Sequence, residues 1–173
     1  MIKIIDNFFD DVLFKNIQNH VSTKLCFEPR YLPHTTEKTK ETHYGSRFVL
    51  TQDPNLFKTF IKQCEKTFKI KIKETYKDSG VDLRNLDFFI PHDDVPTGSK
   101  INILIMIKGR TAVNNGTVFY HKEKDKSVLD IHVGFRENRA VLFPSSWVHS
   151  AHARKEDGVK RYTATLFVTD YEE

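Results

Sequence analysis

The sequence has few of the features that mark a secreted or membrane-bound protein. It contains 2 cysteines in 173 residues, and Cys26 and Cys64 lack the spacing of a zinc or redox motif, so we expect free thiols in a reducing compartment. No apolar run approaches the ~20 residues that a membrane helix needs. The N-terminal stretch MIKIIDNFFDD places acids where a signal peptide has its apolar region. These absences favour a cytoplasmic protein without a membrane segment.

The chain also lacks a strong excess of charge of one sign. Its formal net charge is +4, with 27 Lys and Arg against 23 Asp and Glu, and the two signs are interspersed. We interpret these charges as an ordinary solvated surface rather than a nucleic-acid footprint. Glycine is scarce at 7 residues whereas phenylalanine reaches 14, which is typical of a folded globular chain. The length suits one domain with its own core.

The first part of the chain predicts two helices. Asp10 or Asp11 can cap a helix that runs to about Lys24, and its apolar face carries Val12, Leu13, Ile17 and Val21. Asp53-Pro54 begins a second helix, which we expect to reach Tyr76, with a stripe formed by Leu56, Phe57, Phe60, Ile61, Cys64 and Phe68. A short strand over 2–5, a loop over 26–40 and a strand over 43–51 complete this part.

From Leu86 onward the pattern changes to short apolar runs broken by turn residues. The runs are LDFFI, INILIMI, TVFYH, SVLDIHVGF, RAVLFPS, WVHSA and RYTATLFV, and the separators include PTGS, Asn114-Asn115-Gly116, Arg136-Glu137-Asn138 and Asp157-Gly158. Many short strands after two helices predict an α+β fold, a jelly roll with both helices packed on one sheet. We treat 1–173 as a single domain, with 1–80 as helical support and 81–173 as the jelly-roll core.

Two metal-ligand types stand together in the segment FFIPHDDVPTGSKINILIMIK. His92 and Asp94 are two residues apart, so an extended backbone points both to the same side. Two histidines and one carboxylate form the facial triad of non-haem Fe(II) oxygenases. His149 and His152 are both candidates for the third ligand. A two-residue turn at Asp157-Gly158 would favour His152, whereas a bulge near the metal would restore His149.

An arginine follows these histidines on the next predicted strand. Arg161 can hold the far carboxylate of a dicarboxylic 2-oxo acid in a bidentate manner. Thr163 shares its strand face, so the hydroxyl can support the same carboxylate. An open-coordinated iron needs such a co-substrate.

At these residues the sequence resembles the 2-oxoglutarate and Fe(II)-dependent oxygenases, particularly the prolyl 4-hydroxylase branch. The resemblance covers roughly Phe88 to Val168 and, more loosely, the opening IKIIDNFF. It rests on the His-x-Asp pair, on NNGTVFY (114–120), on NRAVLFPSSWVH (138–149) and on Arg161-Tyr-Thr. The chain departs from the family where Asn115-Gly116 replaces two glycines and where Lys108 replaces a frequent asparagine. The step from His149 to Arg161 is also slightly longer than usual.

The resemblance implies a double-stranded β-helix, the jelly roll also found in cupins, and a dioxygenase activity. Such an enzyme hydroxylates a peptide or protein (prolyl-type) or a small molecule while 2-oxoglutarate becomes succinate and CO2. The cofactors would be Fe(II), 2-oxoglutarate and O2, with ascorbate as an optional addition. The family spacing from Phe143 favours His149 as the ligand beside His92 and Asp94, and 2-oxoglutarate would contact Arg161 and Thr163.

Further side chains are candidates for the pocket. Asn102 can bind the 2-oxo acid or be a satisfied core amide, and Tyr120 can close the pocket or only pack. Substrate candidates are Tyr44 and Arg47 at the pocket mouth and Trp147 and His152 in its wall. We expect a peptide or small-molecule substrate and not nucleic acid, because no aromatic and basic cluster suits a flipped base. The oligomeric state is left open.

Two alternatives remain at this stage. In the first, the protein is a non-catalytic jelly roll with a binding or structural role, and its histidines are structural. In the second, it is a cupin-type metalloenzyme that does not use 2-oxoglutarate. The second alternative predicts that Arg161→Ala stays fully active.

Overall fold

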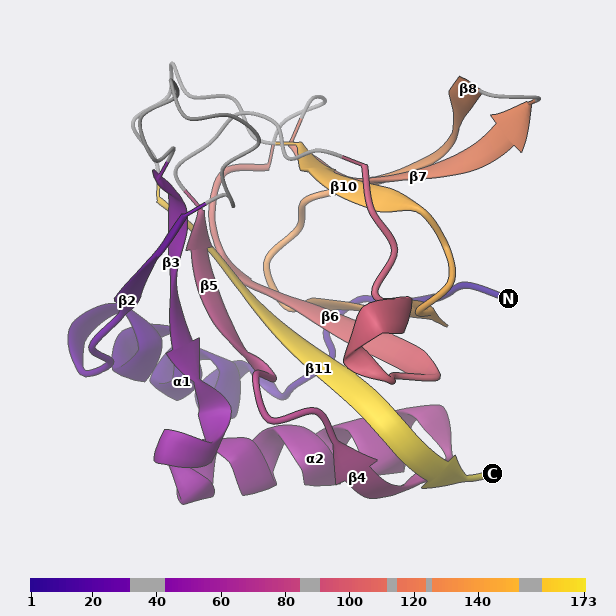
Figure 1. The fold of residues 1–173 in the computed structure, drawn as a ribbon. Coiled ribbons are helices and arrows are strands. Elements are labelled where there is room, and N and C mark those ends of the chain that lie inside the picture. The colour runs from indigo at the N-terminus through magenta and orange to yellow at the C-terminus, as the bar shows by residue number, and fades with distance from the viewer. Residues whose placement is uncertain (32–42, 85–90, 112–114, 124–125, 153–159) are drawn as a thin grey trace.

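The computed structural model describes residues 1–31, 43–84, 91–111, 115–123, 126–152 and 160–173 (Figure 1). These residues form two antiparallel β-sheets and two α-helices. Both helices lie against one face of the larger sheet, and the smaller sheet lies on its other side (Figure 1). The α+β double-stranded β-helix predicted from the sequence is therefore confirmed. Within the described residues, no helix is long and apolar enough to cross a membrane.

The N-terminal part supplies both helices and several strands of the larger sheet. Its elements are β1 (Lys3–Ile5), α1 (Asp11–Thr23), β2 (Glu28–Tyr31), β3 (His43–Val49), the 3-10 turn η1 (Leu50–Gln52), α2 (Pro54–Phe68), β4 (Lys71–Thr75) and β5 (Gly80–Arg84). The Asp10 carboxylate caps α1 by accepting from Leu13 N at 2.9 Å. Asp53 caps α2 in the same way, with Pro54 in the first turn. Both helix starts are thus as predicted.

The C-terminal part supplies the remaining strands. They are β6 (Ile101–Lys108), β7 (Gly116–Glu123), β8 (Lys126–Gly134), β9 (Arg139–Pro144), β10 (His149–His152) and β11 (Arg161–Glu172), and the 3-10 turn η2 (Val95–Thr97) precedes β6. The larger sheet has the order β1-β9-β6-β11-β5-β3-β2, with β4 also paired to β11. The smaller sheet has the order β10-β7-β8.

Three features of the N-terminal part differ from the prediction. The second helix ends at Phe68 and not near Tyr76, because Lys69 takes a left-handed conformation (φ 58°) and the chain turns back as β4 against β11. The predicted loop over 26–40 contains the strand β2, and residues 32–40 lie outside the described residues. No strand was predicted for residues 80–84, which form β5. In each case pairing with a distant strand decides the local structure.

The predicted strand LDFFI (86–90) lies outside the described residues, as does the Asp157-Gly158 turn. The other six predicted C-terminal runs correspond to β6 to β11.

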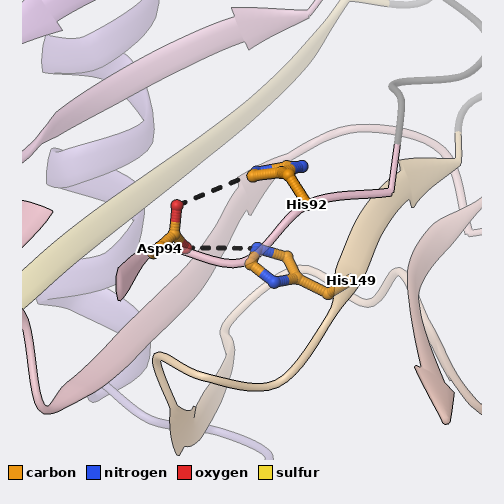
Figure 2. Close-up of side chains that lie close together, drawn as sticks. All are labelled: His92, Asp94 and His149. Atoms are coloured by element: carbon orange, nitrogen blue, oxygen red, sulfur yellow. Dashed lines mark ion pairs between the residues drawn. The ribbon is translucent and has the colours of Figure 1, made fainter. Parts of the chain in front are cut away.

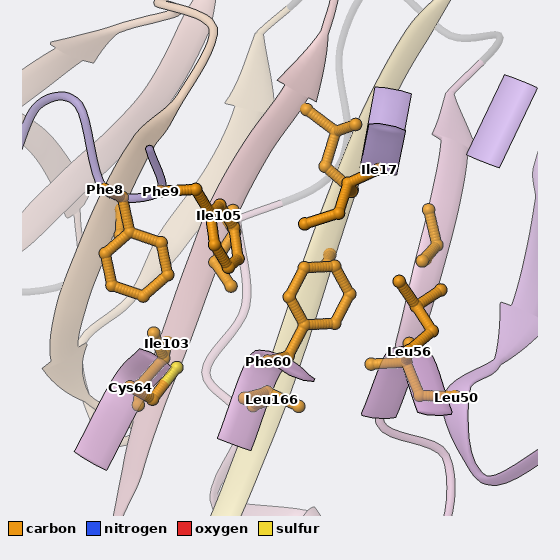
Figure 3. Packing of buried hydrophobic residues seen from close by; sticks show 14 of the residues in the cluster. Phe8, Phe9, Ile17, Leu50, Leu56, Phe60, Cys64, Ile103, Ile105 and Leu166 are labelled. Atoms are coloured by element: carbon orange, nitrogen blue, oxygen red, sulfur yellow. The ribbon is translucent and has the colours of Figure 1, made fainter. Parts of the chain in front are cut away.

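The buried side chains form two clusters on opposite faces of the larger sheet. One cluster joins the helices to the sheet and includes Phe9, Phe60, Ile103 and Leu166 (Figure 3). The second lies between the two sheets and includes Leu104, Met106, Phe119, Val133, Phe135, Val141 and Phe143. Because successive residues of a strand point to opposite faces, each central strand contributes to both clusters.

This alternation decides which side chains can reach a site between the sheets. On β11, Tyr162, Ala164, Leu166 and Val168 pack toward the helices. Arg161, Thr163, Thr165 and Phe167 lie on the opposite face and line a cavity. The larger sheet therefore presents a row of polar side chains to the space between the sheets.

Candidate metal centre

Backbone pairing brings His92 and His149 together across 57 positions of sequence. His92 N donates to His149 O at 3.0 Å, and His149 N donates to His92 O at 2.8 Å. Asp94 N donates to Ser145 O at 2.9 Å, which anchors the next part of the same loop. The two segments thus run side by side, and their side chains can converge.

One ligand atom from each of His92, Asp94 and His149 lies within 4.8 Å of the others (Figure 2). Asp94 Oδ2 is 3.3 Å from His149 Nε2, and Asp94 Oδ1 is 3.8 Å from His92 Nε2. The two nitrogen atoms and the carboxylate surround a common point, as a facial two-histidine, one-carboxylate set requires. In the described part of the chain, this is the one group of His, Cys, Asp and Glu that could hold a metal ion.

The environment of His149 suits a neutral metal ligand. Its Nδ1 lies 2.9 Å from the carbonyl oxygen of Trp147. A carbonyl only accepts, so Nδ1 carries the proton and Nε2 keeps a lone pair that faces Asp94. Burial lowers the pKa of His149, and this effect outweighs the opposing charge of Asp94. The imidazole is therefore held in the form that binds metals.

The carboxylate of Asp94 is oriented by a buried amide. Asn102 is 0% exposed, and its Nδ2 donates to Asp94 Oδ2 at 2.5 Å. Its Oδ1 accepts from the hydroxyl of Ser99 at 3.1 Å, and that hydroxyl lies 2.8 Å from the hydroxyl of Thr97. From sequence, Asn102 could have reached a 2-oxo acid or been a satisfied core amide. In the structure, its amide is hydrogen-bonded to Asp94 and Ser99.

A cavity of about 330 Å³ extends from these three residues along β11. Arg161 also lines this cavity and is 3% exposed. Its Nη1 donates to the backbone oxygens of Gly116 (2.8 Å) and His152 (2.6 Å). Its Nε is buried without a hydrogen-bond partner among the residues that the structure describes. Thr163 lines the same wall.

Burial disfavours the charged form of Arg161. Burial lowers its pKa to about 9, and the nearby charge of Arg84 acts in the same direction. Because the pKa of Arg161 is lowered by burial and by a like charge, an anion bound beside it would stabilise its charged form. The cavity is thus lined both by the three candidate metal ligands and by the buried guanidinium of Arg161.

Of the other predicted site residues, one lines the cavity and three do not. Arg47 lines the cavity, but Tyr120, Trp147 and His152 are not among its lining residues. The hydroxyl of Tyr120 lies 2.8 Å from the hydroxyl of Ser150 and 3.3 Å from His152 Nε2. The structure therefore does not bring these three side chains to the cavity wall. The side chain of Tyr44 is outside the described part.

Two residues of the cavity region were missed from sequence, Asp82 and Arg84 on β5. Asp82 is 2% exposed and pairs with Arg47 through Nε–Oδ1 (2.8 Å) and Nη2–Oδ2 (2.9 Å) contacts. Burial raises the pKa of Asp82, but the charges of Arg84 and Arg47 outweigh it, so the pKa lies below its usual value. The alternation in GVDLR was a signal for a strand that places both residues on one face.

Comparisons with known proteins bear on the fold. No protein-family model matches the sequence, and no curated protein matches it. Solved structures do match. A prolyl hydroxylase from Trichoplax adhaerens, solved with a peptide fragment of the hypoxia inducible factor oxygen degradation domain, has a TM-score of 0.60 at 16% identity. The match covers 96% of this chain and 82% of the hydroxylase chain.

Structures of two further proteins match nearly the whole chain. The non-haem α-ketoglutarate-dependent epimerase SnoN of nogalamycin biosynthesis has a TM-score of 0.65 at 10% identity, over 99% of this chain and 78% of its own. A second SnoN structure contains Fe3+, α-ketoglutarate and nogalamycin RO. An oxidoreductase of the 2OG-Fe(II) oxygenase family from Burkholderia pseudomallei has a TM-score of 0.62 at 13% identity, over 99% and 84%.

These matches show that the chain has the fold of 2-oxoglutarate and Fe(II)-dependent oxygenases, including a prolyl hydroxylase. The chain also carries a His-x-Asp…His group in that fold. At such low identities the likeness concerns the fold, and the activity has to be argued from the site.

Proposed function

We propose that this protein is a 2-oxoglutarate and Fe(II)-dependent dioxygenase that oxidises an organic substrate and releases succinate and CO2. One observation carries the proposal: a group of two imidazoles and a carboxylate shares a cavity with a buried arginine. Each part alone has an ordinary structural explanation. Their combination in one cavity of about 330 Å³ matches the needs of a metal and a dicarboxylic acid together.

The ligand set fits ferrous iron. His92, Asp94 and His149 offer two nitrogen atoms and one oxygen, and the 2-His-1-carboxylate set is typical of non-haem Fe(II) oxygenases. Three protein ligands leave further coordination positions for a co-substrate. The hydrogen bond from Asn102 to Asp94 and the contact of His149 Nδ1 with Trp147 O would hold two of the ligands in place.

Arg161 fits the far carboxylate of 2-oxoglutarate. Its Nε has no hydrogen-bond partner in the described residues, although a buried nitrogen of this kind is costly to leave unpaired. A carboxylate in the cavity would supply the missing acceptor and neutralise the charge. Thr163 lies two residues along the same strand face and is 3% exposed, so its hydroxyl can donate to the same group.

Bound iron and 2-oxoglutarate would supply the oxidising chemistry of the reaction. The residues of this chain have three tasks. Arg161 and Thr163 hold the far end of the co-substrate, and the three ligands orient the metal. Buried apolar side chains such as Leu104 and Phe143 line the same cavity and restrict water.

The molecules bound in two of the matching structures guide the choice of substrate class. The Trichoplax hydroxylase was solved with a peptide fragment, and SnoN was solved with nogalamycin RO. Hydroxylation of a peptide or small molecule is the reaction we propose, with epimerisation as the alternative outcome in the same fold. Product analysis distinguishes the two, because only hydroxylation adds an oxygen atom to the substrate.

Calorimetry on the purified protein tests the proposal. Loaded with Mn(II) as an inert substitute for iron, the protein should bind 2-oxoglutarate, and with Fe(II) and O2 it should form succinate. Metal binding without any 2-oxoglutarate binding would contradict the proposal and indicate a cupin-type metalloprotein. If neither binds, the chain is a jelly roll with a non-catalytic role.

A further inference from the structure

Arginines occupy three of four cross-strand positions in one row of the larger sheet. Arg161 on β11 is the pairing partner of Arg84 on β5, Arg84 is the partner of Gly45 on β3, and Gly45 is the partner of Arg30 on β2. Partners in adjacent antiparallel strands point to the same face. We call Arg30, Arg84 and Arg161 the arginine row. Both Arg84 and Arg161 line the cavity, so the row lies on the face that carries the candidate metal centre.

The next row on the same face has alternating charges. Its members are Glu28, Arg47, Asp82 and Thr163, in the strand order β2, β3, β5 and β11. Arg47 engages both carboxylate oxygens of Asp82, at 2.8 and 2.9 Å. Arg84 reaches Asp82 through a single contact of 3.5 Å. Asp82 is therefore paired mainly with Arg47.

Two atoms of the arginine row are buried and unsatisfied. Within the described residues, three buried side-chain nitrogen or oxygen atoms lack a hydrogen-bond partner, and two of them are Arg30 Nε and Arg161 Nε. Like charges placed opposite each other also destabilise a sheet. Burial and, after it, the charge of Arg84 lower the pKa of Arg161. Such a row is stabilised when anions bind to it.

The centre of the row is a glycine, Gly45. A Cβ on Gly45 would lie 2.6 Å from the backbone oxygen of Leu83, so no larger residue fits there without moving a strand. Gly45 therefore places no side chain between Arg30 and Arg84. The strands that carry these two arginines are two strand spacings apart, roughly 10 Å. Long guanidinium side chains on either side of such a gap can converge on one anion.

We propose that Arg30 and Arg84 bind an acidic group of the substrate, a carboxylate or a phosphate, and that this protein therefore oxidises an anionic substrate. The inference rests on the proposed function, in which 2-oxoglutarate uses one carboxylate at the metal and the other at Arg161. The co-substrate then has no carboxylate left for Arg30, which lies three strands from Arg161, or roughly 14 Å. A second acid has to come from the substrate.

The test uses inorganic phosphate and, separately, acetate as probes on protein saturated with Mn(II) and 2-oxoglutarate. Calorimetry should show binding of at least one probe, and the tighter one indicates whether the substrate carries a phosphate or a carboxylate. Arg30→Gln and Arg84→Gln should each weaken that binding about tenfold or more, as expected for loss of a charge-assisted hydrogen bond. Arg30→Gln should leave the affinity for 2-oxoglutarate unchanged.

Arg136→Gln is the matched control. Arg136 is an exposed arginine whose Nη1 pairs with Asp6 at 3.0 Å, and it takes no part in the row. Its loss should not alter probe binding. Arg30→Lys, which keeps the charge, should retain part of the affinity. Equal binding by wild type, Arg30→Gln and Arg136→Gln would overturn the inference, and so would a loss of 2-oxoglutarate affinity in Arg30→Gln.

The two proposals fail separately in this design. Protein that binds a probe through Arg30 but never binds 2-oxoglutarate would contradict the dioxygenase and retain the anion site. Protein that binds 2-oxoglutarate but neither probe would contradict the anion site and retain the dioxygenase proposal. In Fe(II) assays, compounds that raise succinate release should be acidic, and Arg30→Gln should raise their KM with little change in kcat. A neutral substrate turned over equally by this variant would overturn the inference.

Discussion

Asn102 and Asp94 form a buried hydrogen-bonded pair, with Nδ2 donating to Oδ2 at 2.5 Å. The pair joins β6 of the larger sheet to the loop that carries two of the three candidate ligands. Oδ1 of the same carboxylate faces His92. The amide therefore restrains one carboxylate oxygen and leaves the other for a metal.

Replacement of this amide should weaken metal binding. Asn102→Leu keeps a side chain of similar size but leaves Asp94 Oδ2 without its donor. We expect Mn(II) affinity to fall by on the order of 10–100-fold, as for other groups that orient a metal ligand. Calorimetric titration of Mn(II) measures this. Ser99→Ala, which removes only the next hydroxyl, should have a smaller effect. A loss of 2-oxoglutarate affinity at unchanged Mn(II) affinity would instead mean that Asn102 contacts the co-substrate.

The choice of the second histidine can be tested directly. His149→Ala should abolish measurable Mn(II) binding, because its Nε2 lies 3.3 Å from Asp94 Oδ2 in the candidate centre. His152→Ala should leave Mn(II) affinity within about twofold, since that side chain contacts Tyr120 and its backbone oxygen, which accepts from Arg161, is retained. The reverse pattern of affinities would assign the metal to His152.

Arg161 should govern the co-substrate and not the metal. Arg161→Gln retains a donor for the backbone oxygen of Gly116 but removes the charge. Loss of a bidentate charged contact costs about 3 kcal/mol, so 2-oxoglutarate affinity should fall roughly 100-fold. Thr163→Val should lower it about tenfold or less. Parallel titrations with Mn(II) should show no change for either variant, and an equal loss of metal affinity would contradict the assigned role.

The buried pair Arg47–Asp82 should contribute to stability. Asp82→Asn leaves the Arg47 guanidinium without its carboxylate, and breaking a buried pair in this way costs about 3–5 kcal/mol. Urea denaturation at pH 7 measures the free energy of unfolding. Asp170→Asn is a control, because Asp170 forms an exposed pair with Lys100 and its loss should change stability little.

The same pair predicts a pH dependence. The pKa of Asp82 is lower in the folded state than its usual value of 3.8, so the ionised carboxylate favours folding. This contribution is complete above the usual value and is lost as the pH falls through the lower folded pKa. Wild type should therefore lose stability over that acidic range more steeply than Asp82→Asn. Identical slopes for the two proteins would show that Asp82 does not titrate as the structure indicates.

Some of the site could be read from sequence because it depends on local geometry. His92 and Asp94 are two residues apart, and so are Arg161 and Thr163. Extended backbone places such pairs on one face whatever the rest of the chain does. The helix starts at Asp53 and near Asp10 were equally local, since a capping side chain bonds to backbone only three residues away.

Other features required the strand order. Residues 71–75 were expected to continue a helix, but they form β4 because β11 offers a pairing edge. The polar side chain of Asn102 gave no indication of its partner until β6 and the ligand loop were placed together. His149 and His152 could not be separated by counting residues, because the bridge between His92 and His149 is set by backbone pairing.

The sequence by itself determined the α+β class, the candidate ligand types and the faces shared by residues two apart, because these follow from periodicity along a single strand or helix. Only the tertiary structure decided that β11, β5, β3 and β2 are neighbours and that Arg30, Arg84 and Arg161 form one row on the face that carries the candidate metal centre. Pairing between strands depends on contacts across many positions of sequence, and no local pattern specifies which strands will meet.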